Sequence, residues 1–341
     1  MLSRFKSAAR ILLKGDAKRK IRNPIPAITD EEVAEIKQFF SREKFFIFGH
    51  ARSGTTLLMR LIRLHPEVHC NYQAHFFTRQ PLLKSLVDTP EAEEWLRRKS
   101  NRWNQGGDLS PLVLRAAADF IMEREAAKEG KRIVGDKSPS STIHGQAVRD
   151  MHAIYPDAKL LYIVRDGRDV LISERFRNLV EESKFLKAED KQIIAELRKD
   201  QAPFTNGTRS IFTENVIRRV AGGWVRNLRE TDGEGRRLFG DNYCSLRYED
   251  MLARPFEEMQ RLWKFLGVEA GPSLEQAILE EMSSNPDEEW QAKRNEDIAS
   301  FLPKGQAGNW QRLFTGRDKT VFKEVAGEML IKWEYEKDLN W

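Results

Sequence analysis

Short apolar runs alternate with helical patterns along most of the chain. The runs at 44–48 (KFFIF) and 131–135 are typical of strands, and 243–251 (YCSLRYEDM) is typical of a strand that runs into a polar end. The run at 160–164 (LLYIV) is continuously apolar. A continuous apolar run is expected of a strand that is buried on both faces of a sheet. Strands that alternate with helices favour an α/β fold, in which a central parallel sheet is flanked by helices.

Polar motifs follow four of these predicted strands. Gly49–Thr56 follows the first, Asp136 and Lys137 the second, Arg165 the third and Tyr248 the fourth. Ligands of open parallel sheets bind beside the carboxyl ends of the strands. The pattern therefore predicts one ligand site at that edge of the sheet.

The first motif, GHARSGTT at residues 49–56, has the two glycines of a phosphate-binding loop between a strand and a helix. A Walker loop has lysine after its second glycine, but here Thr55 holds that place and the cation of the loop is Arg52. Backbone N–H groups of residues 53–56 are expected to face an anion at the start of the helix.

Two further stretches point to a second anionic group on the ligand. Arg165 closes the apolar run and Ser173 follows eight residues later, which offers a bidentate guanidinium and a hydroxyl. The stretch FLPKGQAGNWQRLFT at 301–315 places Lys304 and Gly305 in a loop that is expected to fold over a ligand.

Together these motifs resemble the cofactor signatures of the sulfotransferase superfamily, whose donor is 3′-phosphoadenosine-5′-phosphosulfate (PAPS). RSGTT resembles the 5′-phosphosulfate loop, VRDGRDVLIS the 3′-phosphate motif, KGQAGNW the C-terminal loop, and RYED the segment whose tyrosine contacts adenine. Pro303 stands where many members have arginine. The resemblance implies a P-loop NTPase-like sulfotransferase fold and a PAPS site made by Arg52, Ser53, Gly54, Thr55, Thr56, Arg165, Ser173, Tyr248, Lys304 and Gly305.

Residues 52–79 resemble most the tyrosylprotein sulfotransferases and related bacterial enzymes. The resemblance implies sulfuryl transfer to an acceptor, which is a carbohydrate, a lipid, a small molecule or a protein tyrosine, with PAP as the product. DKSP resembles a family element whose lysine falls on Lys137, so Arg52 and Lys137 are expected to stabilise the developing negative charge. A sulfuryl group carries less charge than a phosphoryl group, so no metal is expected to be required.

The general base is open at this stage. In the tyrosylprotein type a glutamate serves, and it falls on Gln73, which cannot accept the proton. We favour His75 as the base, with Asp136 as a second candidate, and neighbours on a strand face opposite ways, so Asp136 and Lys137 are not expected to share one side. Gln73, Phe76 and Phe77 are predicted on the acceptor side.

The chain has 341 residues, 40% of them hydrophobic and 32% charged, and its net charge is +5. Residues 1–22 hold eight Lys and Arg against Asp16, which makes +7 there and −2 over the remainder. This basic stretch, with apolar residues at helical spacing, is open to interpretation as a disordered arm, a peripheral membrane helix or a transit peptide. Because the body is net negative, we expect no nucleic-acid partner.

We predict an arm and helix over 1–40 and one sulfotransferase domain over 41–341, with a helical insertion near 178–210. The helix is expected to have Thr29 or Asp30 as its N-cap. Two cysteines cannot form a disulfide framework, which favours a cytoplasmic protein, with membrane contact only through the arm.

Two other functions fit parts of this pattern. A P-loop kinase would need lysine after Gly54, and the chain has Thr55 there. A catalytically silent protein that binds PAP or forms a membrane scaffold would fit Gln73 and the basic arm.

Overall fold

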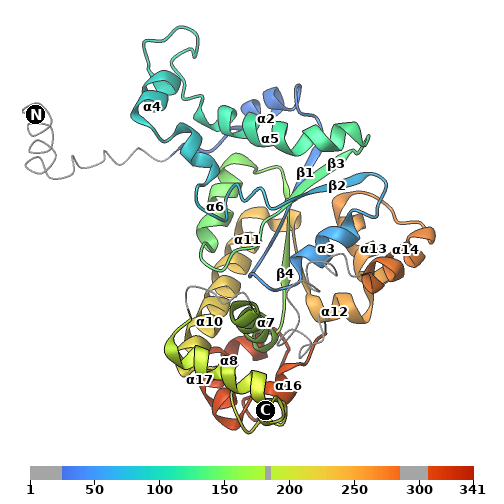
Figure 1. Ribbon diagram of the computed structural model, residues 1–341. Helices are drawn as coiled ribbons and strands as arrows, with labels where there is room; N and C mark the ends of the chain where they lie inside the picture. The colour runs from blue at the N-terminus through green and yellow to red at the C-terminus, as the bar shows by residue number, and fades with distance from the viewer. Residues whose placement is uncertain (1–24, 181–185, 285–305) are drawn as a thin grey trace, which may run out of the picture.

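The computed structural model describes residues 25–180, 186–284 and 306–341, and within these ranges the chain forms a five-stranded sheet (Figure 1). The strand order is β2 (Val68–Tyr72), β3 (Ile133–Lys137), β1 (Glu43–Gly49), β4 (Lys159–Val164) and β5 (Tyr243–Arg247), and neighbouring strands are all parallel. The predicted parallel α/β sheet is confirmed. β2 was not among the predicted strands, because its five residues VHCNY carry no apolar run.

Helices connect the strands and cover both faces of the sheet (Figure 1). In the described ranges the longer helices are α2 (Asp30–Ile36), α3 (Thr55–Ile62), α4 (Pro90–Arg97), α5 (Ser110–Lys128), α6 (Gly145–Ile154), α7 (Gly167–Val180), α8 (Ala188–Lys199), α10 (Glu214–Asn227), α11 (Gly233–Phe239), α12 (Tyr248–Ala253), α13 (Pro255–Leu266), α14 (Ser273–Ser283) and α17 (Gly316–Lys332). Shorter turns are η1 (Leu83–Val87), α9 (Ala202–Thr205), η2 (Leu228–Asp232), η3 (Gly240–Asn242) and α16 (Trp310–Leu313).

The two faces of β1 build two separate cores. Phe46 and Phe48 join the larger cluster, which includes side chains of α5, α6, α7, α10 and α17. Phe45 and Ile47 point the other way, into a cluster with α3, α12, α13 and α14. Side chains of a strand alternate between the faces of a sheet, so one apolar run supplies both cores. β1 is thereby fixed in the centre of the molecule, and the loop that follows it is fixed as well.

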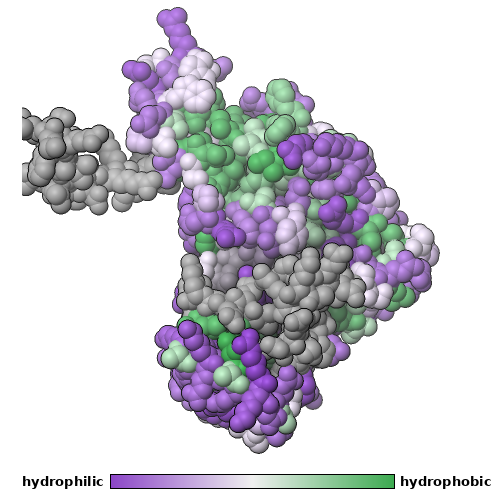
Figure 2. All heavy atoms as spheres, in the orientation of Figure 1, coloured by the Kyte–Doolittle hydropathy of each residue, from purple (hydrophilic) through white to green (hydrophobic). Residues whose placement is uncertain are grey.

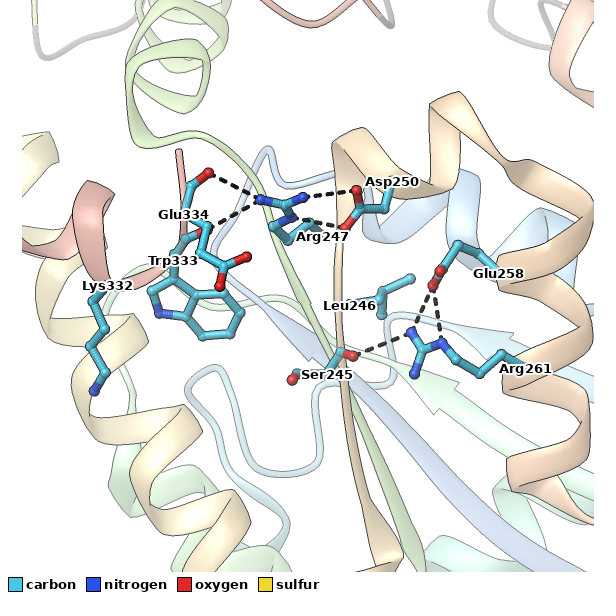
Figure 3. A pocket seen from close by; sticks show the side chains of 9 residues that line it. All are labelled: Ser245, Leu246, Arg247, Asp250, Glu258, Arg261, Lys332, Trp333 and Glu334. Atoms are coloured by element: carbon cyan, nitrogen blue, oxygen red, sulfur yellow. Dashed lines mark hydrogen bonds and ion pairs between the residues drawn. The ribbon is translucent and has the colours of Figure 1, made fainter. Parts of the chain in front are cut away.

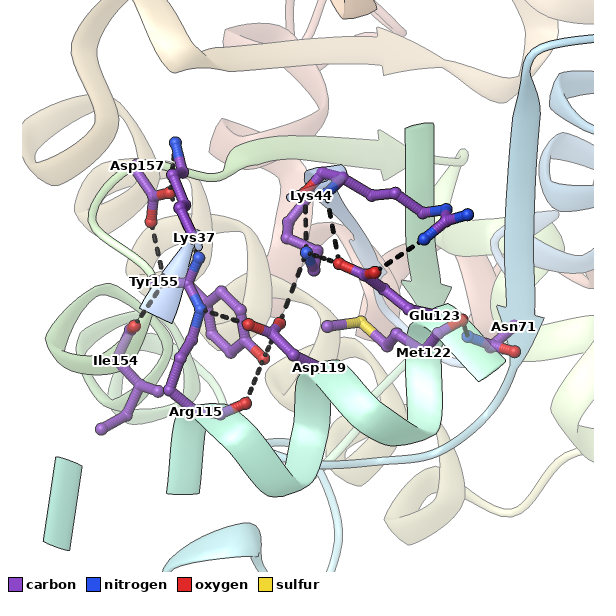
Figure 4. Close-up of polar contacts among 11 residues, drawn as sticks. Lys37, Lys44, Asn71, Arg115, Asp119, Met122, Glu123, Ile154, Tyr155 and Asp157 are labelled. Carbon is purple, nitrogen blue, oxygen red and sulfur yellow. Dashed lines mark hydrogen bonds and ion pairs between the residues drawn. The ribbon is translucent and has the colours of Figure 1, made fainter. Parts of the chain in front are cut away.

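A buried cluster of charges ties α5 to the amino end of β1 (Figure 4). Asp119 on α5 accepts a hydrogen bond from Arg115 at 3.0 Å and lies 3.6 Å from the ammonium of Lys44 on β1. The same ammonium contacts Glu123 at 2.7 Å, and Arg115 reaches Asp157 at 2.8 Å. Buried ion pairs of this kind require partners for every charge, so the cluster fixes where α5 lies against β1.

The amino-terminal helix α2 begins at Asp30, and Thr29 is its N-cap. The hydroxyl of Thr29 accepts from the amide of Glu32, and Glu32 bonds the amide of Thr29 in return, which is a capping box. The predicted start of this helix is confirmed. Its contacts with α5, and the bond from Ile28 N–H to the carbonyl of Ala153, attach it to the domain. The basic stretch 1–22 lies outside the described residues.

The segment predicted as a helical insertion near 178–210 contains the end of α7, then α8 and α9. α8 buries Ile193 and Leu197 in the larger core, and its Asp190 pairs with Arg175 of α7 at 2.8 Å. The segment is therefore helical in its described part and packed on the domain. Its interpretation as an insertion stays a prediction.

The surface in Figure 2 is largely hydrophilic, with apolar side chains gathered beside α4 and α5. Large exposed apolar side chains on or near these helices include Leu86, Trp95, Trp103 and Phe120. Within the part of the chain that the structure describes, no helix combines the length and apolar character needed to span a bilayer.

Candidate functional site

The central place of β1 brings the predicted motifs to one edge of the sheet. Ile47 pairs with Lys137 of β3, and Gly49 pairs with Ile163 of β4, so the loop after Gly49 emerges between the ends of these two strands. The chain leaves β1 toward β2 at one side of the sheet and leaves β3 toward β4 at the other side. The carboxyl ends of the central strands are therefore a topological switch point. Such points are where open parallel sheets bind ligands.

The loop after β1 turns sharply into α3. Arg52 has φ 73° and Gly54 has φ 86°, and Gly54 caps the helix. The ring of Tyr248 packs so closely that a Cβ on Gly54 would lie 2.2 Å from it. Ser53 N–H donates to the carbonyl of His50 at 3.2 Å, which corrects the expectation that this amide faces an anion. The N–H groups at the start of α3 remain, because a first helical turn cannot pair its own amides.

The residues predicted for two separate anions are in direct contact. Arg52 Nε donates to Ser173 Oγ of α7 at 3.0 Å, and Arg165 Nη1 donates to the carbonyl of Arg52 at 3.2 Å. The guanidinium carbon of Arg165 lies 4.8 Å from the centre of the Tyr248 ring. The loop, the end of β4 and the start of α12 therefore form one continuous basic and aromatic surface.

Two buried polar atoms at this surface lack a hydrogen-bond partner within the described part of the chain. They are Ser53 Oγ and Arg165 Nε. Buried polar atoms are normally paired, so unpaired ones call for an explanation such as a bound ligand. Both belong to residues that the sequence analysis assigned to the nucleotide.

The C-terminal loop is attached to the same motif. Arg165 Nη2 donates to the carbonyl of Gln306 at 3.0 Å, and Asp169 accepts from Gly308 N–H at 2.6 Å and from Trp310 N–H at 3.1 Å. Burial raises the pKa of Asp169 above its ordinary value. Lys304 and Gly305 lie outside the described residues, but the chain directly after them is held here. The sequence analysis missed Asp169, because its partners are backbone amides about 140 positions away.

Lys137 is buried at the end of β3 and faces the loop. Its ammonium lies 3.2 Å from Thr56 Oγ1 and 3.9 Å from the centre of the Tyr72 ring. Tyr72 pairs with Lys137 in the sheet register, so the two side chains lie on one face. Burial lowers the pKa of Lys137 to about 8. Sequence reasoning missed Tyr72, whose strand was not predicted.

Asp136 faces away from Lys137, as the strand periodicity predicted. Its carboxylate accepts from Ala74 N–H at 2.9 Å and from the hydroxyl of Ser138, and only 1% of the residue is exposed. Burial raises the pKa of Asp136 to about 6. Both oxygens are thus engaged by the protein itself, which counts against Asp136 as the base.

His75 is half-buried just after β2. Its Nδ1 lies 2.9 Å from Thr78 Oγ1, and burial together with the Arg79 and Lys137 charges holds its pKa below the ordinary value. When Nδ1 donates to Thr78, Nε2 carries the lone pair. Gln73 lies two residues earlier and is partly exposed.

Phe76 and Phe77 do not line an open surface in this structure. They are 6% and 4% exposed and belong to the larger core, where Phe77 packs edge-on against Phe46 and Tyr155. The turn after β2 directs both rings into this core. An acceptor-side role for them stays a prediction.

A cavity of about 300 Å³ lies elsewhere, between β5, α13 and α17 (Figure 3). Its two arginines already have carboxylate partners: Arg247 binds Asp250 at 2.8 Å, and Arg261 binds Glu258 at 2.7 Å. We therefore do not assign the predicted anion site to it. In the described ranges no group of three or more His, Cys, Asp or Glu side chains is arranged to hold a metal ion.

Comparison with known proteins identifies the family. The sequence profile of the Sulfotransferase family matches residues 44–272, and the chain belongs to this family. Protein-tyrosine sulfotransferase of Drosophila melanogaster is 26% identical over 65% of the chain and 38% of its own length. Protein-tyrosine sulfotransferase A of Caenorhabditis elegans is 24% identical over 67% of the chain and 51% of its own length. The chain thus spans only about 40–50% of the length of these curated relatives.

Solved structures of sulfotransferases also align with the chain at low similarity. A mouse sulfotransferase complexed with PAP is 17% identical, covers 89% of the chain and 90% of its own, and has a TM-score of 0.46. The sulfotransferase domain from the curacin biosynthetic pathway is 17% identical, covers 84% and 97%, and has a TM-score of 0.47. Alignments this distant do not bear on ligand or acceptor.

Proposed function

We propose that the protein transfers a sulfuryl group from PAPS to a hydroxyl or amine of an acceptor, releasing PAP. The observation that carries this proposal is the contact chain Arg52–Ser173 and Arg165–Arg52. It joins the phosphate loop to a second anion-binding pair, and a donor with a 3′-phosphate and a 5′-phosphosulfate presents two such groups.

The residues present fit this donor. Ser53 Oγ and Arg165 Nε are buried polar atoms that lack protein partners in the described ranges. Gly54 leaves room for the ring of Tyr248, which lies against the loop and beneath the Arg165 guanidinium. Arg52, Arg165 and Lys137 place positive charge at this loop, which suits an anionic ligand. Lys304 and Gly305 are proposed to complete the site on the strength of the sequence.

Bound PAPS supplies the activated sulfuryl group and the leaving nucleotide. Arg52 and Lys137 supply fixed positive charge where negative charge develops, and Lys137 is already held against Thr56 at the start of α3. Because Lys137 has a pKa of about 8, it is largely charged at neutral pH and loses its charge in alkaline solution.

His75 is the proposed proton acceptor. It is the imidazole that follows β2 next to Lys137, its lowered pKa keeps it neutral at pH 7, and Thr78 orients the ring. Gln73 cannot take this role, because a side-chain amide is too weak a base to remove a proton from the attacking hydroxyl or amine. A transfer assay with labelled PAPS tests the assignment in wild type, His75→Ala and Gln73→Glu, using carbohydrate, lipid, small-molecule and tyrosyl acceptors in parallel. Full activity of His75→Ala would refute His75 as the base.

The donor itself is tested by calorimetric binding of PAP against ATP with Mg²⁺. We expect wild type to bind PAP in preference to ATP, and Arg165→Ala to lose at least about tenfold in PAP affinity, because one guanidinium contact to an anion contributes on the order of 1.5–3 kcal/mol. Arg124→Ala is the matched control, since Arg124 is exposed on α5 next to Glu123 at the opposite end of β1. A preference for ATP with Mg²⁺ would favour the kinase alternative and overturn the proposal.

PAP binding without turnover on any acceptor class would instead identify a silent nucleotide-binding protein. The imidazole of His75, oriented by Thr78, favours the active enzyme, because nucleotide binding alone needs no proton acceptor there.

A further inference from the structure

The turn after β2 is attached to the end of β3 through three successive amides. Gln73 N–H donates to the carbonyl of Lys137 at 3.0 Å. Ala74 N–H donates to Asp136 Oδ1 at 2.9 Å, and His75 N–H donates to Ser138 Oγ at 2.9 Å. Two of the three acceptors are therefore side chains rather than the backbone.

The backbone of this turn is held in an unfavourable conformation. Gln73 has φ 58° and His75 has φ 55°, both in the left-handed region that residues other than glycine rarely adopt. Such residues cost free energy and persist only where the surroundings hold them. The side chains of Gln73 and His75 point where they do because of this pair of left-handed residues.

Asp136 and Ser138 form a relay that holds the turn. The hydroxyl of Ser138 accepts from His75 N–H and donates to Asp136 Oδ2, while Asp136 Oδ1 accepts from Ala74 N–H. All these bonds run toward the carboxylate. Burial raises the pKa of Asp136 to about 6, so the carboxylate is ionised at neutral pH and titrates in mild acid.

The charged and titratable groups near Asp136 come from three elements. Lys137 follows it on β3, and its charge acts to lower the pKa of Asp136. The Cys70 thiol lies on β2, where its pKa is raised by burial and by the Asp136 charge. His75 lies on the turn itself, and Phe46 is the neighbour across β1. Asp136 is the carboxylate that receives the bonds of the turn.

We propose that Asp136 and Ser138 are positioning residues that clamp residues 73–75, so that Gln73 and His75 are presented to the acceptor only while Asp136 is ionised. The inference rests on the proposed function for its meaning in catalysis. It makes mild acid a condition under which the acceptor side is released, although the donor side remains formed.

The physical basis is that both oxygens of the Asp136 carboxyl can accept hydrogen bonds only while the group is ionised. An ionised carboxylate only accepts, so it satisfies Ala74 N–H and the Ser138 hydroxyl together. A protonated carboxyl must place its own proton, and the side that faces Ser138 then becomes a donor. Ser138 loses its acceptor, and both amides of the turn are held more weakly, because bonds to a charged group are stronger than bonds to a neutral one.

Hydrogen exchange resolved to single amides tests the clamp on the full chain. In wild type we expect the protection factors of Ala74 and His75 N–H to fall at least about tenfold between about pH 7.5 and about pH 5, as the carboxyl takes up its proton. Gln73 N–H, whose acceptor is a backbone carbonyl, serves as the internal reference.

Two variants separate the parts of the relay. Asp136→Asn mimics the protonated acid, so Ala74 and His75 should exchange fast at both pH values, with no pH dependence. Ser138→Ala removes the acceptor of His75 alone, so Ala74 should keep its protection. Asp150→Asn on the surface of α6 is the matched control and should behave as wild type. The proposal would be overturned if the protection of Ala74 and His75 N–H in wild type did not change with pH, or if Asp136→Asn showed the wild-type pattern.

Global stability distinguishes positioning from a general structural role. Folding raises the pKa of Asp136 from 3.8 to about 6, so the free-energy cost of its charge in the folded state builds up between these two pH values and is complete above about pH 6. Asp136→Asn should therefore unfold at the same or higher denaturant concentration than wild type at about pH 7.5, although the turn exchanges faster. A loss of stability together with the loss of protection would make Asp136 a structural residue only. If wild type failed to bind PAP, the proposed function would fail, and the exchange result would still decide the clamp.

Discussion

At the scale of single residues, the site combines charges whose ionisation differs from that of the free side chains. Lys137 has a pKa of about 8 because it is buried, and His75 has a lowered pKa for the same reason. The cation is thus easily lost and the imidazole is neutral, each of which suits its proposed role.

The pH dependence of PAP binding follows from Lys137. An anion binds the protonated lysine better, so PAP affinity should fall as the pH rises above about 8, and binding should take up a proton in that range. Calorimetry in buffers of different ionisation enthalpy measures both effects. Lys137→Arg should shift the loss to higher pH, and an unchanged profile in that variant would assign the titration to another group.

Gly54 offers a second test at residue scale. Gly54→Ala would bring a methyl group within 2.2 Å of Tyr248 at φ 86°, so the ring or the loop must move. We expect PAP affinity to fall by about tenfold or more, which corresponds to about 1.4 kcal/mol. Gly233→Ala, where no atom lies within 4 Å of the added carbon and φ is negative, is the control. Equal PAP affinities in the two variants would contradict the placement of Tyr248 in the site.

The sequence predicted these residues to the extent that each belongs to a local motif. Arg52, Gly54, Arg165 and Ser173 stand in short patterns, and the structure brings them together. Tyr72 and Asp169 were not predicted, because their partners are distant in sequence and their own neighbourhood carries no pattern. Nothing in the sequence showed that Phe76 and Phe77 turn into the core.

At the scale of elements, the start of α7 holds the C-terminal loop. Asp169 accepts from two backbone amides of that loop, those of Gly308 and Trp310. The guanidinium of Arg168 lies 3.6 Å from the Trp310 ring, which adds a cation–π contact. The start of α7 and the described part of this loop, residues 306–310, therefore form one unit.

Asp169→Asn should loosen this unit. An amide that replaces the carboxylate presents a single acceptor oxygen and two donors, so one of the two loop amides loses its partner. We expect faster hydrogen exchange at Gly308 or Trp310 and a weaker affinity for PAP. If exchange rises while PAP affinity stays unchanged, the loop does not contribute to donor binding.

Elements that carry a clear local sequence pattern were predicted, and elements that lack one were not. The apolar runs of β1 and β4 and the cap of α2 were read correctly from the sequence. β2 was missed because VHCNY has neither a clear alternation of polar and apolar residues nor a continuous apolar run. It forms a strand only by pairing with β3. Sheet pairing between distant segments is a tertiary effect that local patterns do not carry.

At the scale of the whole molecule, the two ends of the sheet have different tasks. The carboxyl end carries the proposed site, and the amino end carries the buried charge cluster of Lys44, Asp119, Glu123 and Arg115 (Figure 4).

Breaking that cluster should cost stability without changing the site. Asp119→Ala leaves buried cations with fewer partners, for which a loss of about 3–5 kcal/mol is expected. Urea unfolding measures it, and Glu125→Ala on the exposed side of the same helix should cost less than about 1 kcal/mol. A loss below about 1 kcal/mol for Asp119→Ala would show that the cluster does not hold α5 on β1.

The central claim is that one site binds two separate phosphates of one nucleotide. The most direct test is a calorimetric cycle of PAP and adenosine 5′-monophosphate on wild type and Ser173→Ala, because the two ligands differ only in the 3′-phosphate. We predict that wild type prefers PAP by at least about tenfold and that Ser173→Ala loses most of this preference while it keeps its affinity for the monophosphate. Equal affinities of wild type for the two nucleotides, or a preference that Ser173→Ala leaves intact, would contradict the account.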